Sequence, residues 1–537
     1  MGILISIYSI FQIAAMQKTT KREILNFLFL LCCYSYFLIR NTNNPHIFKL
    51  LEHSIIFFSI IHLCYTSINI KNRFENISLA FLYSTVIISF YGIGQYLNLW
   101  DYSEYFRIWG TYNNPAEYAA TVSFSIPFIL YYTHSDKMEM RIFAWSIICI
   151  AFIVIILSGS RTGIITCTII FLIYTFKYIF IKILWWKIII IIFLFITFFI
   201  ILYYTKEDSA NGRLLIWDCT INLIKEKPLF GYGYNEFEAN YMAYQAKYFI
   251  QHPDSKYAML ADNIRHPFNE FLLLSMEFGL CSFIPIILIV IYLTNIYIKC
   301  KNNVTFTCIL SLLSIGFFSC FSYPFRIPLT WIILSFNIGT LLSYSCKNNK
   351  HIQITNFKKF IIGTFYCLLS IYTIRNGYYE YKRYKLKELN SLSEREFIIS
   401  EYSKLYDKHY KNPQFLYNYS AEMNYYGLNL KSLELIKECE VYVNDYNVQM
   451  LKAQIKVELG DLEGAEQSYN LASDMCPSKF APLYELARIK EQQRDYEALK
   501  EIAIQIIEKP VKVPSAKVYA IKDLMNDILK KQSDNRN

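Results

Sequence analysis

Long apolar runs alternate with short polar loops up to about residue 375, and the pattern becomes that of a soluble protein afterwards. The run at 185–204 (WWKIIIIIFLFITFFIILYY) would be apolar on every face of a helix, which excludes an ordinary soluble helix. About 20 helical residues cross a bilayer core, and a helix satisfies its own backbone hydrogen bonds in lipid. We therefore predict about twelve membrane-spanning helices, near 3–16, 24–40, 54–70, 78–98, 117–133, 142–158, 163–181, 185–204, 271–298, 304–322, 327–345 and 358–375.

This pattern predicts an all-α fold with four regions. Residues 1–204 hold the first eight spans of a polytopic helical membrane bundle, and residues 205–270 form one long polar loop. Residues 271–375 hold the last four spans, and residues 376–537 form a soluble helical tail.

Charge sets the expected orientation of the spans. The chain is 54% hydrophobic and 18% charged, whereas a soluble domain carries about 25% charge. The net charge of +10 gathers in alternate short loops, such as 17–23, 71–77 and 134–141, as the positive-inside rule expects. With an even number of spans, we expect both termini and the long loop to lie on the outer face of the membrane. This distribution favours a membrane protein over a nucleic-acid-binding one.

Cysteine and histidine are not arranged for metal binding. Most of the 14 cysteines fall in apolar runs, where they act as small hydrophobic side chains, and the eight histidines are scattered. No CxxC pair or zinc-like Cys/His spacing occurs. We expect no metal and no cofactor.

The tail carries a helical repeat. The stretch 446–479 fits the 34-residue tetratricopeptide pattern, with weaker copies from about 412 and from about 480. Its diagnostic positions are Ala453, Gly460, Ala465, Tyr469, Ala472 and Pro477. Stacked repeats of this kind form an α-solenoid with a concave surface. We expect this surface to bind a protein partner or an acceptor; the alternative is a spacer that only stabilises the end of the chain.

Five motifs at the expected outer face carry candidate chemistry. GTYNNPAEYAA (110–120) places Asn114 at a span entrance, where an ordinary Asn–Pro helix cap is the competing interpretation. SGSRTG (158–163) places Arg161 in a tight outward turn, against the usual charge bias, which favours an anion contact over simple snorkelling.

The long loop supplies the third motif, NGRLLIWDCTINLIKEKPLFGYGYNEF (211–237). It predicts an amphipathic helix that starts at Arg213, with Leu214 to Trp217 on or near one face. A guanidinium suits phosphate oxygens, although a surface arginine on an interfacial helix is the alternative. The Gly231-x-Gly233 turn is weak support for phosphate binding, because it lacks the GxGxxG spacing and a preceding strand.

The last two motifs lie where the chain returns to the membrane. RHPFNEFLLLSMEFG (265–279) carries His266, which can share a proton near neutral pH, and Glu270, which could cap the helix or orient His266. SYPFRIP (322–328) places Arg326 between two prolines, where function and snorkelling are equally plausible.

Together these motifs resemble a known family. The order Gly-x-x-x-Asn-Pro, Ser-Arg-x-Gly, Gly-Arg…Trp…Pro…Gly-x-Gly and His-x-x-x-x-x-Leu…Glu-x-Gly, around one long outward loop, is similar to the O-antigen ligase and polymerase superfamily. That family includes bacterial O-linked oligosaccharyltransferases, and some members carry C-terminal tetratricopeptide repeats.

The resemblance implies a metal-independent, inverting transfer of glycan from undecaprenyl diphosphate to a hydroxyl acceptor. In this chain Arg161 and Arg213 would bind the diphosphate and His266 would activate the hydroxyl. Asn114, Trp217, Glu270 and Arg326 are further candidates for substrate binding. The acceptor could be the lipid A core (ligase), the growing glycan (polymerase) or a protein Ser or Thr. Membrane lipids are the other expected partners.

A non-enzymatic function is the competing class. A flippase for lipid-linked glycans should carry charged groups deep within several spans, whereas these spans are nearly uncharged. An assembly scaffold would not require Arg161, Arg213 and His266 together.

Overall fold

The computed structural model describes residues 18–40, 47–66, 70–100, 103, 106–112, 114–178, 204, 206–346, 351–353, 356–388 and 395–534. This part of the chain divides into two compact units. Unit 1 contains the residues up to 205 together with 268–274 and 280–375. Unit 2 contains 206–267, 275–279 and 376–537.

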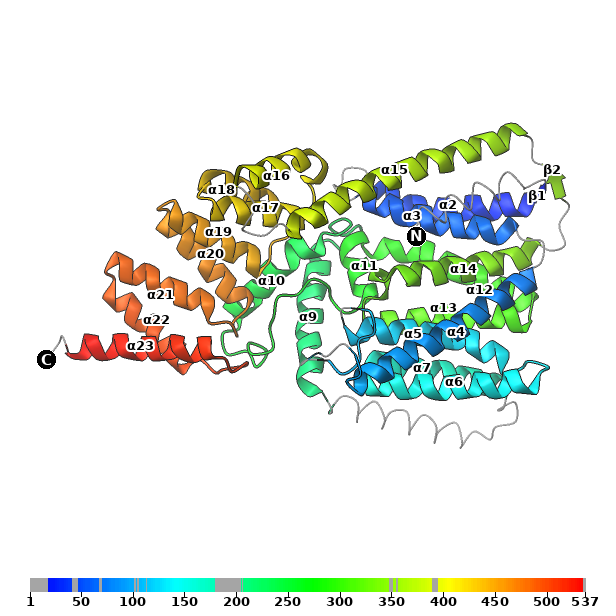
Figure 1. Cartoon of the computed structure of the whole chain (residues 1–537), viewed down its shortest axis with the longest axis horizontal. Coiled ribbons are helices and arrows are strands. Elements are labelled where there is room, and N and C mark those ends of the chain that lie inside the picture. The colour runs from blue at the N-terminus through cyan, green and yellow to red at the C-terminus, as the bar shows by residue number, and fades with distance from the viewer. Residues whose placement is uncertain are drawn as a thin grey trace. The chain divides into compact units, whose positions relative to one another are not determined.

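Unit 1 is a bundle of helices that run alongside one another (Figure 1). Its elements are β1 (Lys18–Thr20), α2 (Lys21–Arg40), α3 (Ile47–Thr66), α4 (Ile70–Tyr96), α5 (Pro115–Tyr132), α6 (Met138–Leu157), α7 (Arg161–Tyr178), η1 (Leu280–Ser282), α12 (Phe283–Lys299), α13 (Asn303–Ser319), η2 (Pro324–Arg326), α14 (Pro328–Cys346) and β2 (His351–Gln353). The two short strands pair antiparallel, with Lys18 opposite Gln353. Helix α5 is buried along most of its length and packs against α4, α6, α7 and α13.

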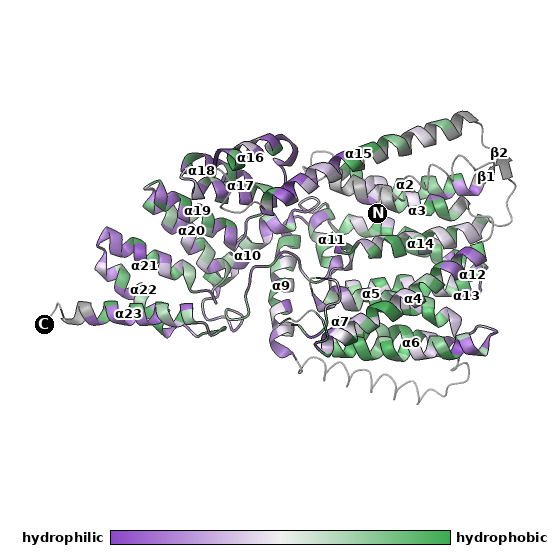
Figure 2. Cartoon of the chain, viewed as in Figure 1, coloured by the Kyte–Doolittle hydropathy of each residue, from purple (hydrophilic) through white to green (hydrophobic). Residues whose placement is uncertain are grey.

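Hydropathy confirms a helical membrane protein with several spans. Among the described residues, five helical segments are long and apolar enough to cross a membrane: Arg22–Ile39, Ile70–Tyr96, Met138–Leu157, Leu280–Lys299 and Pro328–Cys346. Figure 2 shows the apolar colouring that these helices share. The predicted spans at 3–16 and 185–204 lie outside the described residues, so the total of twelve stays a prediction.

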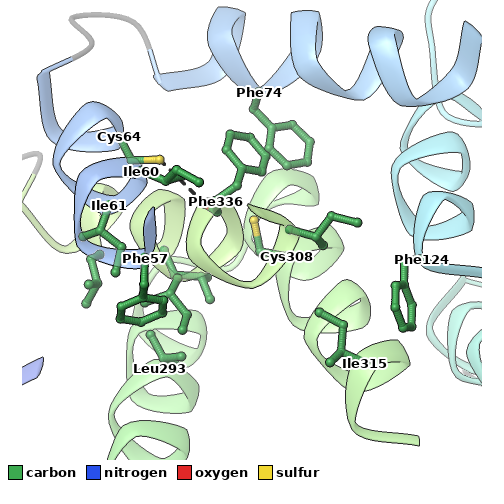
Figure 3. Close-up of a cluster of buried hydrophobic side chains, with 14 of the residues drawn as sticks. Phe57, Ile60, Ile61, Cys64, Phe74, Phe124, Leu293, Cys308, Ile315 and Phe336 are labelled. Carbon is green, nitrogen blue, oxygen red and sulfur yellow. Dashed lines mark hydrogen bonds between the residues drawn. The ribbon is translucent and has the colours of Figure 1, made fainter. Parts of the chain in front are cut away.

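Small residues allow close packing inside unit 1. Figure 3 shows Cys64 of α3 beside Phe336 of α14: the Cys64 thiol donates to the Phe336 carbonyl at 3.8 Å, and the Phe336 ring lies next to Phe74 of α4. A Cβ at Gly339 would lie 2.7 Å from the Cβ of Cys64, so glycine permits this approach. Small residues at helix contacts serve the same purpose in membrane bundles generally.

Unit 2 joins the long loop to the tail. The loop forms α9 (Glu207–Glu226) and α10 (Phe237–Gln251), and α10 packs on α20 of the tail. The tail helices are α16 (Arg395–His409), α17 (Pro413–Tyr425), α18 (Asn429–Glu440), α19 (Tyr446–Glu458), α20 (Leu462–Met475), α21 (Ala481–Gln493), α22 (Tyr496–Glu508) and α23 (Ala516–Asp534). Successive helices pack on one another from α17 to α23, which makes the tail an extended helical array.

Local signals explain where the array helices begin. An Asp or Asn side chain precedes four of them and accepts a hydrogen bond from a backbone N–H of the first turn, as N-cap residues do. These caps are Asn412, Asp445, Asp461 and Asp495. The small residues Ala453, Ala465 and Ala472 are fully buried between helices.

Two elements differ from the sequence prediction. The helix expected over 271–298 is broken: α11 (Glu270–Phe278) ends at Gly279, whose φ is +74°, and η1 and α12 follow. Helix α15 (Asn356–Glu388) continues without a break past residue 376, where the sequence pattern becomes soluble.

Candidate functional site

The first motif forms the entrance of α5. Asn114 caps this helix: its Oδ1 accepts hydrogen bonds from the N–H groups of Ala116 (2.9 Å) and Glu117 (3.0 Å), and Pro115 opens the helix. The Asn114 amide nitrogen donates to the Glu117 carboxylate at 3.0 Å and to the Tyr323 hydroxyl at 2.9 Å. The predicted cap is therefore present, and the same side chain also links α5 to the loop before η2.

The Gly110 backbone in this motif is clamped by a side chain from α4. Gln95 accepts from the Gly110 N–H at 2.8 Å and donates to its carbonyl at 2.9 Å. Gly110 has a φ of +63°, and a Cβ there would lie 2.6 Å from the ring of buried Tyr118. The glycine is thus required by conformation and by packing.

The second motif is a helix–turn–helix corner between α6 and α7. Gly159 takes a φ of +67°, and Ser160 caps α7 through its Oγ, which accepts from the Gly163 N–H at 3.4 Å. A Cβ at Gly163 would lie 2.8 Å from the Cβ of Ala119, so α5 and α7 approach closely here. Thr162 donates to the Phe321 carbonyl at 3.3 Å.

The charged residue of this motif is Arg161. It is the first residue of α7, its side chain is half-buried, and the first turn of α7 carries no acidic residue. The positive end of a helix dipole disfavours a cation and favours an anion. A half-buried arginine at this position therefore suits an anionic ligand.

The segment Phe321–Arg326, which includes η2, connects the motifs of unit 1. The Phe321 carbonyl accepts a hydrogen bond from Thr162, and the Tyr323 hydroxyl accepts one from Asn114. The Tyr323 ring packs on Phe268, with ring centroids 5.6 Å apart. The Phe325 N–H donates to the Glu270 carboxylate at 3.1 Å. We call Phe321–Arg326 the hub segment, because parts of three other motifs meet on it.

Glu270 does not cap α11. Asn269 does so, since its Oδ1 accepts from the N–H groups of Phe271 (2.9 Å) and Leu272 (3.1 Å). Glu270 is held instead by the hub segment, where burial raises its pKa to about 7. The Phe325 hydrogen bond and the charge of Arg326 oppose this rise but do not cancel it.

The third motif lies in unit 2 and differs in detail from the prediction. Helix α9 begins at Glu207, so Arg213 lies in its second turn and does not start it. The buried face contains Leu215, Ile216 and Leu223, whereas Leu214 is exposed. Leu214 is exposed because four successive apolar residues, 214–217, cannot all lie on one face of a helix.

Arg213 lies one helical turn before Trp217, so both side chains project from the same side of α9. The Trp217 indole N–H donates to the Pro267 carbonyl at 2.9 Å. His266 is the residue just before Pro267, and its side chain is half-buried. Unit 2 therefore brings the Arg213 turn of α9 to the segment that carries His266.

The Gly231-x-Gly233 turn has a structural task. The N–H groups of Tyr232 and Gly233 donate to the carbonyls of Met276 (2.9 Å) and Glu277 (2.8 Å) at the end of α11. A Cβ at Gly231, whose φ is +64°, would lie 2.5 Å from the Met276 carbonyl oxygen. The turn thus caps a helix C-terminus, and Gly233, whose φ is +127°, also adopts a conformation that favours glycine, so neither glycine requires a phosphate.

The candidates fall into two groups. Unit 1 gathers Asn114, Glu270 and Arg326 around the hub segment and joins the Arg161 turn to it through Thr162. In unit 2, the hydrogen bond from Trp217 to Pro267 joins the helix that carries Arg213 to the segment that carries His266. Sequence reasoning missed Tyr323, although it lies inside the SYPFRIP motif. In the described part of the chain, no three His, Cys, Asp or Glu side chains are placed to hold a metal ion.

Residues 145–287 match the family model for O-Antigen ligase. This match confirms the predicted relation to the O-antigen ligase superfamily. The matched region includes Arg161, Arg213, His266 and Glu270, and it spans the break between α11 and α12. Asn114, Arg326 and the helical array lie outside it. No curated protein matches the chain.

Proposed function

We propose that this protein transfers a glycan from undecaprenyl diphosphate to a hydroxyl acceptor at the outer face of a bacterial inner membrane. The observation that carries the proposal is the O-antigen ligase match over 145–287, which includes both candidate arginines and the candidate histidine. The hub segment adds support, because it ties the Arg161 turn to Asn114 and Glu270.

The donor diphosphate binds to Arg161 and Arg213 in this proposal. Arg161 combines its guanidinium with the N-terminus of α7, so charge and helix dipole act together on an anion. Arg213 supplies a second guanidinium from α9, and the apolar spans accept the polyprenyl chain. Positive groups placed where charge develops are commonly the largest single contribution to catalysis.

The transfer is one displacement at the anomeric carbon. The acceptor oxygen forms a bond to that carbon from the face opposite the diphosphate, and the carbon–oxygen bond to the diphosphate breaks. The bonding electron pair goes to the diphosphate oxygen, where the arginines stabilise it. His266 takes the proton of the acceptor hydroxyl. The configuration inverts, and no step requires a metal ion.

The acceptor is large in two of the three forms that this proposal takes. Transfer to the lipid A core or to a protein Ser or Thr would employ the helical array as a tetratricopeptide-like docking surface. Transfer to the growing glycan would make the protein a polymerase. The long loop and the array lie on the periplasmic side in each form.

The decisive experiment is rescue of a gene-deletion strain with wild type, Arg213→Ala or His266→Ala. Lipopolysaccharide, undecaprenyl-linked glycan and glycoproteins are measured together. We expect wild type to restore one glycoconjugate, which identifies the acceptor. Both variants should accumulate lipid-linked glycan. We expect the rate of transfer to fall at least about 100-fold, as it does when a transition-state contact is removed.

Two control variants match these changes. Arg488→Ala removes an exposed arginine of α21, and His252→Ala removes an exposed histidine after α10. All variants must reach equal membrane levels, and both controls should restore the product fully. Full rescue by Arg213→Ala and His266→Ala would refute the site and favour a scaffold or transport function.

A further inference from the structure

The segment leading to His266 is held by the helical array. Ser478 donates to the Ala261 carbonyl at 3.2 Å, and Lys479 lies 3.6 Å from the Asp262 carboxylate. Gln245 of α10 is fully buried and donates to two carbonyls, that of Asp262 at 3.1 Å and that of Met475 at 2.6 Å. All these contacts lie within unit 2.

Within the array, Asp445 contacts the residues that lie closest to His266 in the sequence, Asn263 and Arg265. Its carboxylate is buried, with 3% of the residue exposed. One oxygen accepts from the Val448 N–H at 3.0 Å and caps α19. The other oxygen accepts from the Asn263 amide at 3.0 Å and lies 3.7 Å from the Arg265 guanidinium. A buried carboxylate is tolerated when such partners surround it.

His266 therefore lies between two fixed points. On one side Asn263 and Arg265 contact Asp445, and on the other the Pro267 carbonyl accepts from Trp217. Fixing the backbone on both sides restricts where the imidazole can reach. A displacement of about 1 Å at a reacting group can cost about 100-fold in rate.

We propose that Asp445 is a positioning residue for His266, so that the helical array helps to hold the transfer site in its active geometry. This inference rests on the proposed function, because it takes His266 as the group that receives the acceptor proton. Asp445 acts through Asn263 and Arg265 and touches no substrate.

Other caps of the array show what an ordinary helix cap looks like. Asp461 caps α20 by accepting from the Gly464 N–H at 3.0 Å, but 54% of its side chain is exposed and it contacts no residue of the 261–267 segment among the described contacts. Asp445 differs because its second oxygen is directed to the loop. Asp461 is therefore the matched control.

The test uses purified full-length protein carrying Asp445→Ser, Asp445→Asn or Asp461→Ser. Serine keeps an N-cap oxygen but is too short to reach Asn263. Asparagine keeps the cap, and a flipped Asn263 amide can still bond to it. The rate at which diethyl pyrocarbonate modifies His266, measured by mass spectrometry, reports the position of the imidazole without any substrate. Glycan transfer is measured in the rescued deletion strain.

We expect Asp445→Ser to raise the rate of His266 modification severalfold and to lower transfer roughly 10- to 100-fold. Asp445→Asn and Asp461→Ser should stay near wild type in both measurements. The inference is overturned if Asp445→Ser leaves the modification rate or transfer unchanged, or if Asp461→Ser is equally impaired. Failure of the proposed function is distinct: His266→Ala would then retain transfer, whatever the modification rates show.

Discussion

Glu270 is a carboxyl group whose charge state is set mainly by its burial beside the hub segment. Burial raises its pKa to about 7, so the folded protein binds this proton more tightly than the unfolded chain does. The resulting stability is fully present below the unfolded pKa, near 4.5, and is lost as pH rises through about 7. Glu270→Gln should therefore flatten the fall in thermal midpoint between pH 5 and pH 8. The difference is at most about 3 kcal/mol, at about 1.4 kcal/mol per pKa unit, and screening reduces it.

Thermal unfolding of the detergent-solubilised protein at both pH values measures this effect. Glu139→Gln, at an exposed position in the first turn of α6, is the control and should keep the wild-type pH dependence. A Glu270→Gln variant that follows wild type at both pH values would contradict the raised pKa. The amide still accepts from the Phe325 N–H, so the variant isolates the titration from the hydrogen bond.

At this scale, the sequence reveals residues whose partners are close along the chain. The cap at Asn114 was predictable because the N–H groups that donate to it follow within three residues. Asp445 and Asn263 are 182 positions apart, and Asn114 and Tyr323 are 209 apart. Only the fold brings such pairs together, so no local pattern could identify Asp445 or the partner of Asn114.

The break between α11 and α12 depends on one glycine. Gly279 has a φ of +74°, and a Cβ there would clash with the Leu229 carbonyl group. Gly279→Ala should therefore destabilise unit 2 by more than the roughly 1–2 kcal/mol that a left-handed conformation alone costs. Gly460→Ala meets the conformational cost only, because its φ is +81° and no atom lies within 4 Å. Gly212→Ala, inside α9 with open space around it, should be stabilising by about 0.5–1 kcal/mol.

Thermal unfolding and membrane levels of the three variants check this order. Equal stability of the Gly279 and Gly460 variants would mean that the contact with Leu229 is not close in the protein. The apolar run at 271–298 could not predict the break, because a continuous apolar run indicates burial or a membrane span but not where a helix is interrupted. The clash that requires glycine comes from Leu229, which lies in another motif.

Elements with strong apolar runs were predicted well. The expected runs at 78–98, 142–158 and 327–345 correspond to α4, α6 and α14, each long and apolar enough to span a membrane. These helices are determined by composition over about 20 residues, which is a property of the local sequence. The rise in polarity near 376 gave no sign that α15 continues through it, because helix formation does not require apolar residues.

For the whole molecule, the main unexpected feature is that the long loop and the helical array form one compact unit. Gln245 and Met475, which are 230 positions apart, share a buried hydrogen bond, and α10 packs on α20. The array therefore supports the loop that carries Arg213 and His266, whether or not it also binds an acceptor.

Docking of an acceptor and support of the loop predict different results when 380–537 is deleted. If the array only docks an acceptor, transfer is lost for that acceptor alone. If the array holds the loop, transfer to every acceptor is lost and 206–267 becomes sensitive to protease, because α10 and the 261–265 segment lose their partners. We expect the second result, measured by rescue of the deletion strain and by limited proteolysis of membranes.

A surface variant separates docking from support in the intact chain. Tyr425 and Leu430, at the turn between α17 and α18, are 71% and 73% exposed, so replacing both with Ser should leave the fold unchanged. If this turn contributes to docking, the double variant loses one acceptor while the deletion loses all of them. If the array only supports the loop, the double variant retains full transfer. A deletion mutant that still transfers glycan to any acceptor would show that the loop folds without the array, and Asp445 could not then be required to position His266.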